Sequence, residues 1–360
     1  MRKLFFKGRL FLFLAILVLI FTGCEKPDEK FSVGFVYPGF VESNQFSRAL
    51  DNARKVIEAR GIKTYCEENV PESAECERVL LKLINKGCKI IYAGSFGFKS
   101  SVERIAPLYP DVKFCHCSGT IQGENVSSFF GRMYEARYLC GIVAGMKTKT
   151  NKVGFVAAKP VSECIRGINA FYLGMRSVNK NASLEVVWTH TWNDFTVEVD
   201  AANILIEKGC DVLAQHQDSH GCMLAAEKAG VYCIGFAVSG EDVAPGAYLT
   251  APVFKWKNYI IGDIEKYKLG KWEGRFYWGG LKEGTVDIDY LTTLCAEGTF
   301  EKVEEAKRKI INGELKIFSG PLYDQKRNLV VKEGDVMSDS EVWNMDWLIL
   351  GINGRLPAKE

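Results

Sequence analysis

The chain has 360 residues, of which 47% are apolar, and its 46 basic residues nearly balance its 44 acidic ones. This length exceeds the size at which one hydrophobic core stops growing, so two domains are expected. The near-neutral charge argues against a nucleic-acid-binding protein, because that class usually carries a basic surface.

The first predicted element is an export signal. Basic residues within the first nine positions precede an apolar run at 10–21, which is shorter than the roughly 20 residues that span a membrane. Small residues then precede Cys24, and this arrangement resembles a bacterial lipoprotein signal, although Phe21 stands where that signal usually carries Leu. The resemblance implies cleavage after residue 23 and a lipid on the Cys24 thiol. An ordinary cleaved signal or an uncleaved anchor is the alternative.

The mature chain would begin with a short tether at 24–30. Removing residues 1–23 leaves 42 basic and 44 acidic residues, and eleven cysteines besides Cys24. An odd number of thiols cannot pair completely within one chain, and several lie in apolar segments, so we interpret most of them as buried core residues. The sequence Cys115-His116-Cys117, with Cys140, is too weak a pattern to predict zinc. No metal and no cofactor are expected.

An internal repeat shows the organisation of the body. The segment LLKLINKGCKIIYA at 80–93 recurs as ANILIEKGCDVLAQ at 202–215, and each copy predicts a helix, a glycine beyond its end and a short apolar strand. Similar strands precede them, SVGFVY at 32–37 and KVGFVA at 152–157. Short buried strands that alternate with helices predict an α/β fold with two doubly wound parallel sheets.

In such sheets ligands bind beyond the carboxyl ends of the strands. This rule points to four loops, at 38–45, 94–99, 158–166 and 216–220. Farther along, we expect a helix at 256–269 that returns to the first lobe, a charged helix at 300–311 and an extended stretch near 329–331.

Four segments together resemble the basic membrane protein family of lipid-anchored substrate-binding proteins. They are FGRMYEARYLCGIVAG at 130–145, ECIRGINAF at 163–171, QHQDS at 215–219 and GPLYDQ at 320–325. The resemblance implies a type I periplasmic-binding fold with two lobes joined by hinge strands, serving an ABC importer. Residues 31–146 with about 257–315 would form lobe 1, and residues 147–256 with about 316–350 would form lobe 2. Members of the family bind purine nucleosides, and the branch that this chain resembles binds a free purine such as adenine.

The family's motifs then assign candidate ligand-binding residues. They are Phe46, Ser95, Phe96, Glu163, Arg166, Asn169, Trp192, Asp218 and Trp256. Aromatic rings would stack on the faces of a heterocycle, and the polar groups would recognise its rim. Phe46 also begins an apolar helical stripe, so a core position is its alternative. Glu163 and Asp218 can instead be solvated or cap a helix, and Arg166 can orient an acid.

Departures from the branch leave the ligand open. Ser43 and Ser239 stand where the branch carries carboxylates, which keeps a larger heterocycle such as riboflavin as an alternative. His216 and His220 are four residues apart, but on a strand-to-loop segment, so they do not predict a metal site. The sequence has no phosphate-binding loop, zinc-protease motif or nucleophile elbow, and an enzyme is not expected. A surface sensor or adhesin remains the second functional class. The expected partners are a small heterocycle, ABC permease and ATPase subunits and the membrane, for a monomer on the extracytoplasmic side.

Overall fold

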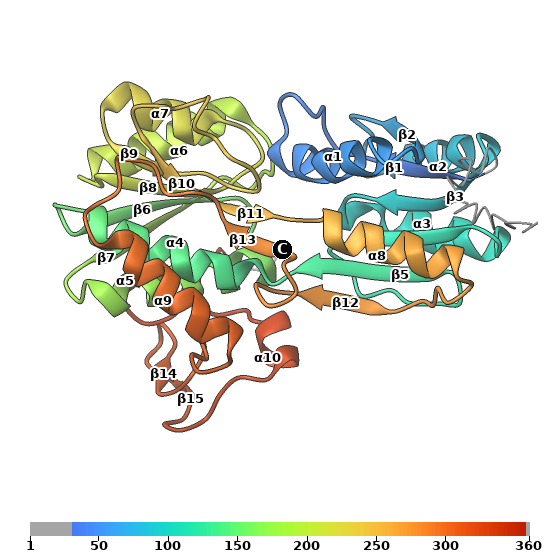
Figure 1. Cartoon of the computed structure of the whole chain (residues 1–360). Helices are drawn as coiled ribbons and strands as arrows, with labels where there is room; N and C mark the ends of the chain where they lie inside the picture. The colour runs from blue at the N-terminus through green and yellow to red at the C-terminus, as the bar shows by residue number, and fades with distance from the viewer. Residues whose placement is uncertain (1–30, 358–360) are drawn as a thin grey trace, which may run out of the picture.

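The first lobe is built around a six-stranded parallel sheet. The computed structural model describes residues 31–357, and this sheet has the order β12-β5-β4-β3-β1-β2 (Figure 1). Its strands are β1 (Ser32–Val36), β2 (Lys63–Glu67), β3 (Cys88–Ala93), β4 (Lys113–Cys117), β5 (Val126–Gly131) and β12 (Phe276–Gly279). The helices that accompany it are α1 (Gln45–Glu58), α2 (Glu75–Asn85), α3 (Lys99–Ile105) and α8 (Lys257–Lys268).

The second lobe repeats this arrangement beside the first. Its sheet has the order β10-β9-β8-β6-β7-β16, and β6 to β10 occupy the same relative positions as β1 to β5. The strands are β6 (Lys152–Ala157), β7 (Ser183–Trp188), β8 (Val212–His216), β9 (Tyr232–Ile234), β10 (Tyr248–Thr250) and β16 (Ile352–Asn353). The helices are α4 (Met133–Lys147), α5 (Ser162–Val178), α6 (Phe195–Glu207), α7 (Gly221–Ala229) and α9 (Thr299–Ile311). The predicted pair of doubly wound parallel sheets is confirmed.

The internal repeat explains the matching halves. In each copy the helix, α2 or α6, ends just before a glycine with positive φ, +86° at Gly87 and +85° at Gly209. Glycine adopts this left-handed conformation without steric cost, so it ends the helix and directs the chain into the next strand. That strand, β3 or β8, lies inside its sheet between two parallel neighbours.

The hinge lies where the chain passes between the sheets. β11 (Pro252–Phe254) and β13 (Val286–Ile288) form an antiparallel pair there, between the lobes in Figure 1. Helix α4 follows β5 directly but packs along α5, and α9 packs on α4. The expected lobe ranges placed α4 and α9 in lobe 1, whereas both helices lie with the second sheet. The cause is the close contact between α4 and α5, where the added Cβ of an alanine at Gly141 would lie 2.1 Å from the Phe171 carbonyl oxygen.

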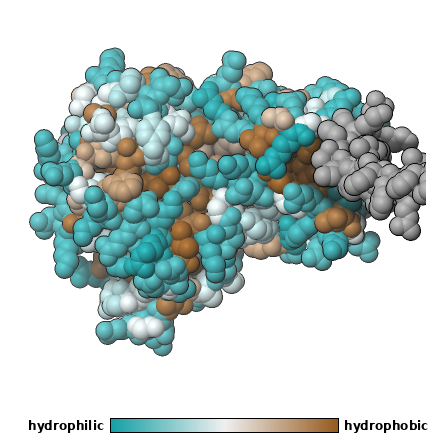
Figure 2. Space-filling view, in the orientation of Figure 1, coloured by the Kyte–Doolittle hydropathy of each residue, from teal (hydrophilic) through white to brown (hydrophobic). Residues whose placement is uncertain are grey.

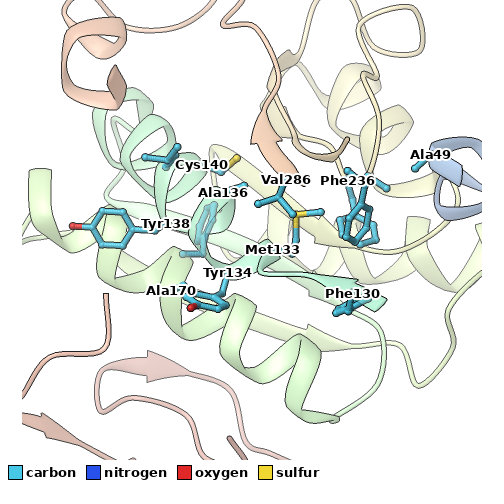
Figure 3. Packing of buried hydrophobic residues seen from close by; sticks show 14 of the residues in the cluster. Ala49, Phe130, Met133, Tyr134, Ala136, Tyr138, Cys140, Ala170, Phe236 and Val286 are labelled. Carbon is cyan, nitrogen blue, oxygen red and sulfur yellow. The ribbon is translucent and has the colours of Figure 1, made fainter. Parts of the chain in front are cut away.

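Almost every residue of α4 is buried, as expected for a helix covered on all sides. Figure 3 shows Met133, Ala136 and Cys140 of this helix in one hydrophobic cluster with Ala170 and Phe236. All eleven cysteines beyond Cys24 are free thiols, and nine of them are buried, which confirms the interpretation of most of them as core residues. On the face shown in Figure 2, hydrophilic residues dominate the surface of both lobes.

The C-terminal segment lies below the hinge in Figure 1 and connects both lobes. It contains β14 (Leu322–Tyr323), β15 (Leu329–Val331) and α10 (Asp339–Trp343), and it ends with β16 on the edge of the second sheet. Asp339 forms a bidentate ion pair with Arg132, at 2.7 and 2.5 Å. Trp343 packs edge-on against Trp278 at 4.9 Å. Among residues 31–357, no helix combines the length and the apolar character that a membrane span needs.

Candidate functional site

A cavity of about 250 Å³ lies between the lobes, at the carboxyl ends of the strands of both sheets. The lining residues from the first lobe follow β1 to β4, and they are Pro38, Asn44, Phe46, Val70, Pro71, Glu72, Ser95, Phe96 and Ser118. Those from the second lobe follow or end β6 to β9, and they are Glu163, Trp192, Asn193, His216, Asp218 and Phe236. The cavity is therefore where open parallel sheets usually bind ligands.

The structure brings six of the predicted site residues together at this cavity. They are Phe46, Ser95, Phe96, Glu163, Trp192 and Asp218. Two of these come from the loop after β3, and Asp218 comes from the equivalent loop after β8. The duplicated halves thus place equivalent loops on opposite sides of one cavity.

Three predicted residues lie elsewhere. Arg166 donates to the Trp343 carbonyl at 3.2 Å, and its guanidinium lies 5.0 Å from the centre of the Trp343 ring. Asn169 is fully buried and pairs with the backbone of the C-terminal segment, donating to the Trp347 carbonyl at 2.8 Å. Trp256 is 1% exposed and stacks on Phe254 at 4.5 Å. These side chains anchor the C-terminal segment and the hinge and are not among the lining residues.

Aromatic side chains supply the apolar walls of the cavity. The half-buried ring of Phe46 packs edge-on against the ring of Phe254, with 5.6 Å between the ring centres. Phe46 therefore contacts the core at the hinge and also lines the cavity. On the opposite side, Phe236 lies 4.3 Å from the His216 ring, and Trp192 lies 6.0 Å from that ring. Phe96 is 62% exposed at the mouth of the cavity. Rings from both lobes can therefore contact the two faces of a flat ligand.

The first lobe contributes a polar rim whose members are held by the local backbone. Asn44 is the N-cap of α1, because its side-chain oxygen accepts from the Ser47 N–H at 2.7 Å. Ser95 donates from its hydroxyl to the carboxylate of Glu72. His116 contacts the Phe96 carbonyl through Nε2 at 3.2 Å, and burial lowers the pKa of this histidine to about 4. His116 is therefore neutral at physiological pH and fixes the loop that carries Ser95 and Phe96.

The second lobe contributes two carboxyl groups and an imidazole. Glu163 lies in the first turn of α5, and its Oε1 is 3.4 Å from Nε2 of His216. Burial lowers the pKa of His216, so the imidazole is neutral and donates from Nε2 to the Glu163 carboxylate. Burial also raises the pKa of Asp218 well above its usual value, and nearby Glu198 adds to the effect. A neutral Asp218 carboxyl can donate as well as accept a hydrogen bond.

Hydrogen bonds join the two lobes beside the cavity. The backbone N–H of Gln45 donates to the Asp218 carbonyl at 2.8 Å, and the Gln45 amide donates to the Ser219 carbonyl at 2.6 Å. Asn44 donates from Nδ2 to the Asp218 carboxyl at 3.3 Å. The structure therefore shows the lobes in contact around the cavity, as expected of a closed state of a two-lobed protein.

Within residues 31–357, no group of three or more His, Cys, Asp or Glu side chains is arranged to hold a metal ion. The lining of the cavity contains no lysine or arginine in this part of the chain. Its polar groups are acids, amides, hydroxyls and one imidazole, a set that suits the rim of a neutral ligand with N–H or O–H donors.

A comparison with protein-family models then identifies the chain. The model of the Bmp family, described as "ABC transporter substrate-binding protein PnrA-like", matches residues 30–319. The chain belongs to this PnrA-like family. The family resemblance predicted from the sequence is thereby confirmed, and the chain is a substrate-binding protein of the ABC transporter type.

Two relatives match nearly the whole PnrA-like chain. A purine-binding protein of Brucella abortus is 34% identical, over 93% of this chain and 96% of its own length. A protein of Haloferax volcanii, named as a candidate ABC transporter glucose-binding protein, is 32% identical, over 93% of this chain and 84% of its own length. Relatives of nearly equal similarity thus carry names with different ligands.

Solved structures show the same fold. A solute-binding protein of Conexibacter woesei superposes with a TM-score of 0.68 at 20% identity, over 79% of this chain and 97% of that one. A solute-binding protein of Aeropyrum pernix gives a TM-score of 0.67 at 21% identity, over 79% of this chain and 92% of that one. At these identities the likeness shows the fold alone.

Several lining residues of this PnrA-like chain were missed by the sequence analysis. Glu72 follows β2, Ser118 follows β4 and Phe236 follows β9. The rule that ligands bind beyond strand ends applies to these strands too, and extending it to every strand would have found them. His216 begins one of the four predicted ligand loops but was not among the predicted site residues, and the structure pairs it with Glu163.

Proposed function

We propose that the protein captures a purine base or nucleoside, with adenine favoured, for an ABC importer on the extracytoplasmic side of a membrane. The observation that carries the proposal is the cavity between the lobes, where aromatic rings from both sheets face a rim of acids and amides. Stacking contributes about 1 to 3 kcal/mol per base, and the rim can satisfy ring and exocyclic N–H groups. The name of the Brucella abortus relative agrees with this ligand class.

The size of the cavity favours a small heterocycle. Pockets for drug-sized ligands measure about 300 to 1,000 Å³, and the cavity of about 250 Å³ lies just below that range. A purine base suits this size better than the three-ring system and ribityl chain of riboflavin. Riboflavin therefore remains the less supported alternative within the transport role.

The direct test is to identify what the protein binds. The chain from residue 25 onward would be purified and unfolded, and any released small molecule would be identified by mass spectrometry. Thermal-shift titrations would then compare adenine, hypoxanthine, guanosine, riboflavin and glucose, and glucose is included because of the Haloferax volcanii relative. We expect a purine to raise the melting temperature most. A response to glucose or riboflavin with none to any purine would overturn the proposed ligand.

Replacing Trp192 by alanine should weaken adenine binding. Trp192 is half-buried at the cavity, and its loss removes a stacking surface worth about 1 to 3 kcal/mol, so Kd should rise roughly fivefold to hundredfold. Isothermal titration calorimetry measures the change. Trp272→Ala is the matched control, because Trp272 is also half-buried but lies outside the cavity lining. Equal Kd values for both variants would mean that Trp192 does not contact the base.

Lipid attachment is proposed on Cys24, which lies outside the described residues. Cys24→Ser should abolish incorporation of labelled palmitate and move the protein from the membrane fraction to the soluble fraction, because one or more acyl chains supply the membrane affinity. Immunoblotting of the fractions and the label measure this. If the serine variant stays in the membrane fraction, the segment before residue 24 acts as an uncleaved anchor.

The transport role is tested against a sensor role by deleting the gene. A sensor role would leave import of labelled adenine unchanged in the deletion strain. We expect the released body to be a monomer.

A further inference from the structure

Arg137 on α4 is a charged side chain without exposure to solvent. The residue is 0% exposed, and its Nη1 donates to the Gln215 carbonyl at 2.6 Å. Its Nε and Nη2 atoms are buried and have no hydrogen-bond partner among residues 31–357. Arg137 forms no ion pair with the residues that the structure describes. A buried charge without a partner destabilises the folded protein, so its presence behind the ligand cavity calls for a physical reason.

The guanidinium of Arg137 lies behind one wall of the ligand cavity. Its central carbon is 4.7 Å from the ring centre of Phe236 and 5.2 Å from that of Phe155. The Gln215 carbonyl that it binds belongs to β8, one residue before His216. Gly167 on α5 lies beside the stem of the side chain, where an added Cβ would be in ordinary contact with Cγ of Arg137 at 3.7 Å. The group is thus placed against two cavity elements, the Phe236 ring and the end of β8.

The charge of Arg137 persists at physiological pH. Burial lowers its pKa to about 10, which still leaves the guanidinium protonated near pH 7. The neighbouring thiols of Cys140 and Cys164 cannot balance it, because burial raises their pKa values and keeps them neutral. Glu163 is the carboxylate whose charge acts on Arg137.

The same carboxylate is the partner of His216. The groups that act on the His216 ring are Glu163 and Arg166 from α5 and Arg137 from α4, while Asp218 follows it on the loop after β8. Glu163 favours a protonated imidazole, whereas both arginines oppose it. Arg166 is also held by the C-terminal segment, at the Trp343 carbonyl. The contacts of Arg137 are instead with the cavity wall, at the Gln215 carbonyl and the Phe236 ring.

We propose that Arg137 is a positioning residue of the ligand site, whose buried charge behind the Phe236 ring and the end of β8 keeps the imidazole of His216, the partner of Glu163, in its neutral form. The imidazole then keeps one state over the physiological pH range. With a neutral imidazole at its wall, the cavity accepts a neutral heterocycle. This inference rests on the proposed function only for the identity of that heterocycle.

The first experiment requires no ligand. Histidine-labelled protein would be titrated by NMR, and the signal of His216 would be assigned with His216→Gln. We expect His216 to titrate below the ordinary value of about 6.5 in the wild type and about one unit higher in Arg137→Met. Arg137→Lys, which keeps a positive charge, should restore the wild-type value. Methionine is similar in length to arginine and suits a buried site. If the Arg137→Met variant does not fold, Arg137→Gln is a second neutral variant. Identical His216 titrations in the wild type and the neutral variant would overturn the proposal.

The second experiment uses adenine as the probe. The Kd of the wild type should change less than about threefold between pH 8 and pH 5.5, whereas that of Arg137→Met should rise up to about tenfold at the lower pH as His216 becomes protonated. A merely structural role of Arg137 would weaken binding equally at every pH, and that result would also overturn the proposal. If adenine fails to bind the wild type, the proposed function fails, while the NMR titration still decides the role of Arg137.

Discussion

Gly174→Ala should lower the melting temperature of the protein by roughly 6 to 12 °C, a large loss of stability for a single added methyl group. The new Cβ would lie 1.9 Å from the carbonyl oxygen of Tyr138, an atom of the α4 backbone. Because backbone atoms cannot rotate away, α4 and α5 must separate, and overpacking of this kind costs about 3 kcal/mol or more. Differential scanning calorimetry of the chain without its signal measures the shift.

The matched control is Gly262→Ala, which makes the same chemical change in α8. An added Cβ at Gly262 would have no heavy atom within 4 Å. Alanine favours a helix over glycine by about 0.5 to 1 kcal/mol, so this variant should melt at the same temperature or slightly higher. Equal melting temperatures for the two variants would show that the α4–α5 contact does not limit stability.

Asp218→Ala should weaken adenine binding by roughly fivefold to hundredfold, whereas Asp218→Asn should stay within about threefold of the wild type. Asp218 is buried, and alanine leaves the Asn44 amide without its partner, a loss of about 1 to 3 kcal/mol. Burial raises the pKa of Asp218 and so favours the protonated carboxyl, and asparagine can reproduce a neutral group with a donor and an acceptor. Calorimetric titration with adenine distinguishes the variants.

The same substitution has a consequence for stability against pH. Between the unfolded and the raised folded pKa, the folded protein holds a proton on Asp218 that the unfolded chain has lost, so stability falls as pH rises through this interval. Asp218→Asn has no such proton, and its melting temperature should decline less between pH 5 and pH 8. An asparagine variant that loses binding as fully as the alanine variant would show that Asp218 acts as an ionised carboxylate.

The duplicated architecture could be predicted from the sequence because its signals are local. The repeated helix, glycine and strand at 80–93 and 202–215 correspond to α2 with β3 and α6 with β8. The placement of α4 could not be predicted in this way. The helix follows β5 in the chain, so sequence order alone assigns it to the first lobe. Its partner is chosen by the shape of the α4–α5 contact, which depends on the side chains missing at Gly141 and Gly174. Similarly, β16 has two residues, too few for a strand pattern, and its place beside β7 is set by tertiary pairing.

The candidate site was predictable as far as its loops, but less so in its residues. Ser95 and Asp218 lie where the strand-end rule places them. Arg166 and Asn169 share the same helix as Glu163, yet they point to the C-terminal segment, whose return across α5 leaves no local signal in the sequence. The proposed role of Arg137 could not be predicted either. The sequence shows an arginine within an apolar helix, but it does not show that this side chain packs against the Phe236 ring.

The equal strand order of the two sheets has a consequence for how a ligand is oriented. β1 with α1 and β6 with α5 are equivalent units, so the starts of α1 and α5 line the cavity as related surfaces from the two lobes. One begins with the amide of Asn44, and the other carries the carboxylate of Glu163 in its first turn. A flat, asymmetric molecule held between them meets an amide at one edge and an acid at the other, and turning it over would mismatch both. The two lobes are related by a nearly two-fold symmetry, and the different residues at equivalent positions would select one orientation of the ligand.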